Sequence, residues 1–436
     1  NRAEASGAIP EALRFLRIAR EHSDEPEAVA DLIGRMGHLH YLRQDLAEAT
    51  PLLELAIQKF RRQGDQARAL ELEVERIDCL AQEGMLPFTE CLEELRRIRS
   101  EAQVAKEWGT YTKALDVEIR RADYRGNQEA VGRALVEARE CKELGGPDAR
   151  CRARVVLALN VYYGTPEVGL AAAREAIAIA LKTEDTDLQL HAINRLIVVL
   201  LYQGRLNTKE GKEAFALAEP RLAKSGDLIL KFFIKLNRAV WHLEVGEFDR
   251  ARAAFRLVEP VIDGTKATDA HAFLFLNEGE LGLATFDIPA ARASYTKAES
   301  FLRPSSPRAF HEIINAGLGL CALHSGDLGE ARHREAELSP FPGFWTSDPS
   351  VIALFKANML RRRGDYSAAD RFLSDVAQNV RHRLVTAWIK ISLERARALR
   401  KGNSSESAEI IRETLNVTME LGLEERTKNL RRLLVS

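Results

Sequence analysis

The sequence has few cysteines, no long apolar run and no surplus of charge of either sign. Its 436 residues include five cysteines, an odd number, and none of them forms a C-x-x-C pair. This pattern argues against a disulfide framework, and we expect reduced core thiols in a cytoplasmic protein. No stretch approaches the ~18 consecutive apolar residues that a membrane span needs. The 63 Lys and Arg nearly balance the 64 Asp and Glu, so generic binding to nucleic acid or to anionic membranes is not expected.

Motifs of known catalytic sites are also missing. There is no G-x-x-x-x-G-K-S/T loop, and the segment from Gly204 to Lys212 lacks its spacing and its closing hydroxyl residue. Neither H-E-x-x-H nor G-x-S-x-G occurs. His38 and His40 are two positions apart, so on a helix their imidazoles lie on different faces and make a poor metal chelate. We therefore expect no enzyme, no cofactor and no metal site.

The first residues do not resemble a targeting segment. Glu4 and Glu11 lie near Arg2, a charge pattern that a secretory signal peptide does not have. The chain begins at Asn1 rather than at a methionine, and we expect it to be part of a longer protein.

What the sequence does contain is helical periodicity. Hydrophobic residues make up 46% and charged residues 29% of the chain, enough of both for a large core and a soluble surface. Apolar residues recur at helical spacing, as in residues 236–243 and 251–258. Strand patterns are almost absent, so we expect an all-α fold.

A turn pattern repeats along the chain at nearly constant intervals. A Gly or polar residue is followed by Asp, Glu or Asn and then, a few positions on, by Ala; the clearest copies begin at Gly246, Gly326 and Gly364. Successive copies are separated by about 40 residues, which indicates one repetitive array rather than several globular domains. The eleven copies begin at Gly7, Gln44, Gly84, Gly126, Gly164, Gly204, Gly246, Phe286, Gly326, Gly364 and Gly402.

The residues around each turn predict a pair of packed helices. Glycine provides the left-handed backbone that ends the first helix, and the acidic residue after it favours the start of the second. A small residue lies seven positions before several turns, as at Gly279 and Gly319, where two helices can approach closely. Phe215, Phe255 and Tyr295 recur once per repeat at the same position, which is typical of a repeated packing contact.

This spacing of small residues, Gly-Asp, aromatic and Ala resembles tetratricopeptide repeats. The long period resembles the repeats in the sensor arrays of MalT-like transcription activators and related signalling ATPases. The resemblance covers roughly residues 5–420, is strongest over 230–380 and is weaker around 84–100 and 204–214. It implies a right-handed superhelical solenoid of about eleven antiparallel helix hairpins with a concave inner face. Because the motif is a packing motif, the resemblance carries the fold and no chemistry.

We expect residues 1–436 to form one such array with two irregular features. An aromatic and proline-rich loop over residues 339–350 cannot be a regular helix, and either docks a partner or fills a gap between repeats. Residues 409–434 keep a helical apolar pattern and are predicted to form a single helix that caps the open end.

Asparagine is the first candidate for a binding role on the concave face. A side-chain amide both donates and accepts, so a row of asparagines could hold the main chain of an extended peptide. The alternative is that each amide bonds to a nearby helix carbonyl and stiffens the array. The six first helices concerned carry Asn160, Asn194, Asn237, Asn277, Asn315 and Asn358.

Other candidate groove residues change in character along the chain. Arg154, Tyr162, His191 and Tyr202 form a polar and aromatic stretch, and Phe233 begins an apolar one. Farther on, a basic stretch could bind a carboxylate, a phosphate or an acidic partner, although cations near a helix C-terminus also suit its dipole. The basic candidates are Arg361, Arg362 and Arg397, with Lys390 between them in the chain.

Together these patterns predict a non-catalytic scaffold that senses a ligand or binds a partner. We expect it to be the regulatory region of a larger signalling or transcription-control protein and to take a peptide, a small molecule or a protein segment in its concave groove. The alternative is a constitutive protein–protein adaptor without a ligand switch. Membrane partners and direct nucleic-acid binding are not expected.

Overall fold

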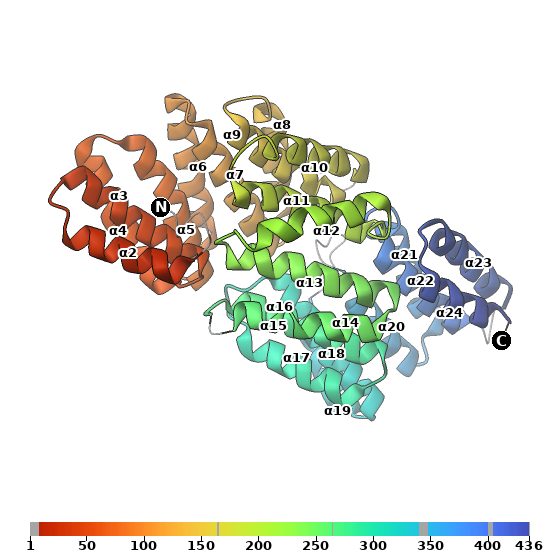
Figure 1. The fold of residues 1–436 in the computed structure, drawn as a ribbon. Helices are drawn as coiled ribbons and strands as arrows, with labels where there is room; N and C mark the ends of the chain where they lie inside the picture. The colour runs from red at the N-terminus through yellow and green to blue at the C-terminus, as the bar shows by residue number, and fades with distance from the viewer. Residues whose placement is uncertain (1–7, 164, 264, 340–347, 400–403, 436) are drawn as a thin grey trace.

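The computed structural model describes residues 8–163, 165–263, 265–339, 348–399 and 404–435. Within these ranges the regular elements are all helices, and they pack as successive antiparallel hairpins from α3 to α23 (Figure 1). The predicted all-α solenoid of helix hairpins is confirmed, with ten hairpins formed by the described residues. None of the described helices combines the length and the apolarity that a bilayer crossing requires.

Each hairpin consists of a first helix and a second helix. The first helices are α3 (Pro26–Leu42), α5 (Gln66–Glu83), α7 (Trp108–Tyr124), α9 (Pro147–Leu157, continued by the 3-10 turn η1, Ala158–Val161), α11 (Thr186–Tyr202), α13 (Leu228–Val245), α16 (Thr268–Ala284), α18 (Arg308–Ser325), α20 (Ser350–Arg362) and α22 (Val385–Leu399). The second helices are α4 (Leu46–Gln63), α6 (Phe88–Ala105), α8 (Gln128–Cys141), α10 (Pro166–Ala180), α12 (Lys209–Leu222), α14 (Phe248–Arg256) with α15 (Glu259–Ile262), α17 (Ile288–Phe301), α19 (Leu328–Glu337), α21 (Tyr366–Val380) and α23 (Ser404–Glu420). Helix α2 (Ile9–Glu21) precedes the first hairpin, and α24 (Glu424–Val435) follows the last.

The predicted turn residues have the left-handed backbone conformation that was expected at each turn. Every one that lies among the described residues has a positive φ, between +58° and +86°. This includes Gln44 and Phe286, although side chains other than hydrogen are disfavoured in the left-handed region. Gly7, Gly164 and Gly402 lie outside the described residues.

Small residues let the first helices approach aromatic side chains of the neighbouring elements. The Tyr295 ring of α17 lies against Gly279 of α16 and Gly317 of α18, where an added Cβ would come within 2.8 and 2.4 Å of ring carbons. A Cβ at Gly319 would lie 2.3 Å from Phe355. The predicted close-packing role of the glycines is therefore confirmed.

The array also contacts itself across several repeats. The Ser305 hydroxyl donates to the carbonyl of Gln82 (2.9 Å), and the Arg383 guanidinium donates to the carbonyl of Tyr162 (2.8 Å). Helices α22 and α24 return to the middle of the array and contact α11 and α13 (Figure 1). Residues of α20 to α22 consequently share one apolar core with residues of α9 to α13.

Two expectations about irregular segments need comment. The single closing helix predicted over residues 409–434 is wrong: the chain breaks at residues 421–423, where Gly422 takes a φ of +66°, and continues as α24. The predicted aromatic loop falls mostly on residues 340–347, which lie outside the described residues. The five cysteines are all buried as free thiols, as expected.

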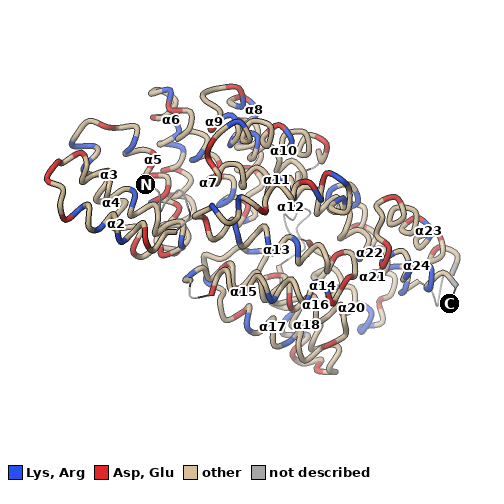
Figure 2. The backbone as a smooth tube through the Cα atoms, in the orientation of Figure 1, with Lys and Arg blue, Asp and Glu red and all other residues tan. Residues whose placement is uncertain are grey.

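Charged residues of both signs are interspersed along the whole chain (Figure 2). Neighbouring helices can therefore form ion pairs throughout the array. One example is Arg99 of α6, which is buried between Glu118 of α7 (2.5 Å) and Glu137 of α8. Many arginines are therefore paired with carboxylates and are not free to bind a ligand.

Candidate functional site

The best candidate for a binding surface is a row of side chains on four consecutive first helices. On α11 these residues come three, four and eleven positions after the first of them, so they share one face, and ring contacts continue the row from α13 to α18. Most of them are half-buried rather than enclosed in the core. We call this set the inner strip; it comprises His191, Asn194, Arg195 and Tyr202 on α11, Phe233 and Asn237 on α13, Phe273 on α16 and Phe310 on α18.

One half of the inner strip is aromatic. The ring centroids of Phe233 and Phe273 are 6.1 Å apart, and Phe310 stacks on Phe273 at 4.9 Å with an angle of 7° between the rings. Of the three, only Phe233 was predicted from the sequence. Phe273 lies one repeat after it, so the repeat period was the signal that could have found the row.

The middle of the inner strip is polar. The Asn237 amide donates to the side-chain oxygen of Asn194 (3.0 Å). The Asn194 amide nitrogen and the Asn237 oxygen form no hydrogen bond with any residue that the structure describes. Arg195 also has no ion pair there, and its Nε is buried without a partner, as is Oδ1 of Asp116 on α7. A donor on α11 and an acceptor on α7 are thus left without a hydrogen-bond partner among the described residues.

Several charges surround His191. Burial lowers its pKa to about 4; Asp116 opposes this effect, while the charges of Arg195, Arg152 and Arg120 add to it. The imidazole is therefore neutral at physiological pH and can both donate and accept a hydrogen bond. The side chain is half-buried, and its place beside a binding surface stays a prediction.

The six asparagines do not form one ladder, because only Asn194 and Asn237 meet. The other four donate to backbone carbonyls, which is the alternative interpretation of the pattern. These bonds run from Asn160 to Leu157 (2.6 Å), from Asn277 to Phe273 (2.7 Å), from Asn315 to Arg334 (2.8 Å) and from Asn358 to Leu354 (2.9 Å).

Two further groove candidates have structural contacts. Arg154 is buried and donates to Glu175 of α10 (2.7 Å) and to Glu143 (2.6 Å), so it ties α9 to α10 and to the segment after α8 and not to the inner strip. Tyr162 is buried, with its ring 5.3 Å from that of Tyr202 in an edge-to-face contact.

Some residues of the predicted basic stretch form ion pairs, and others are exposed to solvent. Arg361 donates to Glu394 (2.6 Å) and so is not free to bind an oxyanion. Arg362 and Arg397 are exposed and form no ion pair with the described residues. The nearby Lys390 side chain is mostly buried and lies beside three carboxylates.

These three carboxylates, Glu244 of α13, Glu280 of α16 and Asp348 before α20, form a group that we call the carboxylate cage. The Lys390 ammonium lies 2.5 Å from Glu244, 2.8 Å from Asp348 and 3.7 Å from Glu280. Burial raises the pKa of Glu280 to about 8 and also raises that of Glu244. For Asp348, burial is outweighed by the Lys390 charge, which holds its pKa below the usual range. No sequence pattern marks this cluster, because its members are far apart in the chain.

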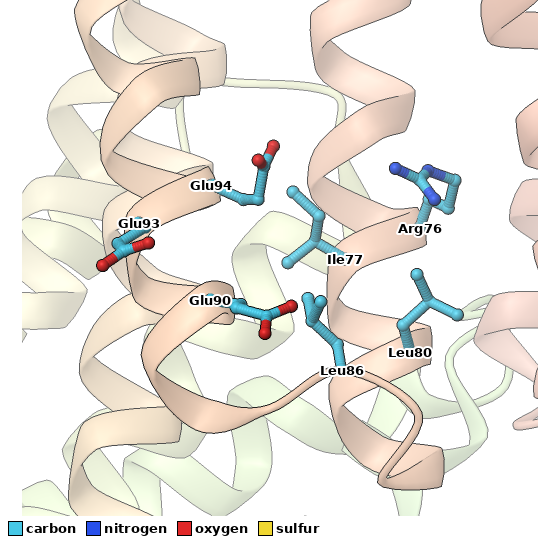
Figure 3. Close-up of a pocket in the computed structure, with 7 residues that line it drawn as sticks. All are labelled: Arg76, Ile77, Leu80, Leu86, Glu90, Glu93 and Glu94. Atoms are coloured by element: carbon cyan, nitrogen blue, oxygen red, sulfur yellow. The ribbon is translucent and has the colours of Figure 1, made fainter.

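A cleft of about 280 Å³ lies between α5 and α6 (Figure 3). Leu80 and Leu86 form part of its apolar lining, and Glu90 and Glu94 approach it from α6 opposite Arg76 of α5. The volume is below that of a typical pocket for a small molecule, roughly 300–1,000 Å³. It is suited to a single side chain of a partner.

Comparison with known proteins supports no closer assignment. No family model matches the chain, and no curated protein matches it. Among solved structures, a monomeric IFIT1 mutant with m7Gppp-AAAA is 13% identical, covering 98% of this chain and 95% of that chain, with a TM-score of 0.47. A human IFIT1 dimer with m7Gppp-AAAA is 12% identical (94% and 95% covered, TM-score 0.43), and the APC/C hetero-tetramer Cut9-Hcn1 is 12% identical (99% of each chain, TM-score 0.34). At these identities and TM-scores the likeness carries no argument about what this chain binds.

Proposed function

We propose that this chain is a non-catalytic scaffold that binds an extended segment of a partner protein along the inner strip. The observation that carries the proposal is the combination, on one row of helices, of three half-buried rings with unpaired polar groups at Asn194, Asn237 and Arg195. Aromatic faces cover apolar side chains, and the polar groups match the amides of a peptide main chain.

The dimensions of the inner strip suit a short peptide. Packed helices lie roughly 9 Å apart, so the three spacings from α11 to α18 span roughly 27 Å. An extended chain rises about 3.3 Å per residue, so the strip would contact about eight residues. A small molecule is not part of the proposal, since the cleft of about 280 Å³ lies between α5 and α6 and not at the inner strip.

The long repeats resemble those of sensor arrays, and this resemblance is what supports a regulatory role in signalling or transcription control. The unpaired, buried cysteines support a cytoplasmic location. Neither point bears on which partner is bound.

A constitutive adaptor is the second candidate function. It is favoured by the bonds that tie distant repeats together, such as those from Arg383 to Tyr162 and from Lys390 to Glu244. These bonds hold the array in one curvature, whereas a sensor that works by changing its curvature would have to break them.

The proposal is tested by selecting peptides of twelve random residues on the immobilised chain and measuring their affinity by fluorescence anisotropy. The test variant is Arg195→Gln, and Arg362→Gln is the matched control, because both arginines lack an ion pair with the described residues and only the first lies in the inner strip. We expect the selected peptides to bind Arg195→Gln at least tenfold more weakly and Arg362→Gln as they bind the wild type. Equal affinity for all three proteins, or a selection that enriches no peptide, would overturn the inner strip as the binding surface.

A further inference from the structure

The carboxylate cage brings together three acidic side chains from separate parts of the chain. One oxygen from each of Glu244, Glu280 and Asp348 lies within 4.8 Å of the other two. Calcium binds oxygen ligands at about 2.4 Å, so two oxygens on opposite sides of one ion are at most about 4.8 Å apart. The three oxygens can therefore contact one cation with only small movements.

The cage is enclosed and holds three carboxyl groups against the one ammonium of Lys390. The three carboxyl side chains are 6%, 11% and 15% exposed, and the Lys390 side chain is 16% exposed. The second base at this place, Arg426 of α24, donates to the main-chain carbonyls of Glu244 (2.9 Å) and Leu243 (3.3 Å) rather than to a carboxylate. A buried ionised carboxylate is costly unless a cation compensates its charge.

Two buried oxygens at the cage have no hydrogen-bond partner among the described residues. They are Oε2 of Glu244 and the hydroxyl of Tyr295, a side chain that is fully buried. The Tyr295 hydroxyl lies near Glu280, whose charge adds to burial in raising the tyrosine pKa. The equivalent positions two repeats and one repeat earlier hold Phe215 and Phe255, so the hydroxyl occurs in the repeat that borders the cage.

We propose that the carboxylate cage is a binding site for one calcium-type divalent cation, held by Glu244, Glu280 and Asp348 in exchange with the ammonium of Lys390. The donor set is oxygen only, which hard cations prefer. Lys390 lies at the position that the ion would take, within 3.7 Å of all three carboxylates. This inference goes beyond the peptide scaffold and departs from the sequence-based expectation of no metal site.

The exchange would connect metal binding to the arrangement of the repeats. Lys390 joins α22 to α13 through its bond to Glu244, a residue 146 positions earlier in the chain. A cation that displaces the ammonium would remove this tie while the Arg426 bonds to α13 remain. The contact between the last repeats and the middle of the array would then depend on the metal.

Terbium is a suitable probe, because it replaces calcium and emits when a nearby tyrosine is excited. We expect saturable Tb³⁺ emission from the wild-type chain that excess Ca²⁺ abolishes, and at least tenfold tighter Tb³⁺ binding by Lys390→Met, which lacks the competing ammonium. The matched control is Arg395→Met, which removes a base from the same helix that pairs with Asp370 and Glu406 outside the cage; its Tb³⁺ affinity should equal that of the wild type.

A second measurement keeps the test decisive if Lys390→Met does not fold. Ca²⁺ should raise the Tm of the wild type and leave that of Glu280→Gln, a neutral isostere, unchanged. The proposal is overturned if Ca²⁺ does not displace Tb³⁺ from the wild type, or if Ca²⁺ leaves both melting temperatures unchanged or raises both equally.

Discussion

Replacing Gly317 by alanine should destabilise the middle of the array, although alanine favours helices. The added Cβ would lie 2.4 Å from Cζ of Tyr295 and 2.6 Å from both Cε atoms, roughly 1 Å closer than an ordinary contact. The ring cannot move away towards α16, because Gly279 already approaches it from the other side. Overpacking of this kind costs about 3 kcal/mol, and the gain in helix propensity returns about 1 kcal/mol.

The expected net loss is thus about 2 kcal/mol, or about 30-fold in the opening equilibrium. A long repeat array does not unfold in one step, so the quantity to measure is the hydrogen-exchange rate of the α16 and α18 amides. The matched control is Gly132→Ala in α8, where no atom lies within 4 Å of the added Cβ. This change should slow exchange in α8 by about fivefold, since only the propensity gain of about 1 kcal/mol remains.

A double variant separates the clash from any other effect of the methyl group. In a Tyr295→Leu background the ring is absent, so Gly317→Ala should cost less than about 0.5 kcal/mol, on the scale within which independent sites are additive. If Gly317→Ala stabilises the wild type as Gly132→Ala does, or costs the same with and without the ring, then Tyr295 does not lie between the two glycines and the packing argument is wrong.

Three other predictions concern single side chains. Burial raises the pKa of Asp227 to about 6, above its unfolded value of about 3.9. The native state therefore binds more protons between these values, and stability falls as the pH rises through this window. Asp227→Asn should stabilise α13 by about 1–3 kcal/mol at pH 7 but not at pH 4, measured by hydrogen exchange of its amides at both pH values. Arg99→Met leaves Glu118, whose side chain is 2% exposed, without its main partner and should cost about 3 kcal/mol. Glu118→Gln should rescue part of this loss, and unchanged hydrogen exchange in α6 and α7 would contradict the prediction. Phe286 has a φ of +58° and is 72% exposed, so Phe286→Gly should raise the Tm through relief of about 1 kcal/mol, whereas Phe286→Ala should not.

The turn period was the part of the fold that could be predicted best from the sequence. Left-handed turn positions need a residue without a large steric penalty, and glycine marks most of them directly. Gln44 and Phe286 carry no such mark, yet the repeat period located both. Local chemistry and repetition were sufficient because each hairpin mainly contacts the next.

The candidate sites were harder to predict for a physical reason. Whether an asparagine faces a groove or bonds a carbonyl depends on a small rotation about the helix axis, and Asn237 and Asn277 share a repeat position but make different bonds. Arg361 and Lys390 were predicted as part of a basic surface, but their partners come from other helices. The carboxylate cage depends on contacts between repeats that the period cannot describe.

Because distant repeats contact each other, this solenoid is not a one-dimensional array in which each repeat contacts only its neighbours. An ordinary solenoid is one-dimensional, so repeats can be added or removed at either end with a nearly constant increment in stability. Here, deleting one hairpin between Tyr162 and Arg383 would shift every later repeat by one position and misalign the bond between these two residues. The bond from Arg383 to Tyr162 therefore fixes the number of repeats between these two residues. In evolution, the array should lose or gain hairpins only outside this interval.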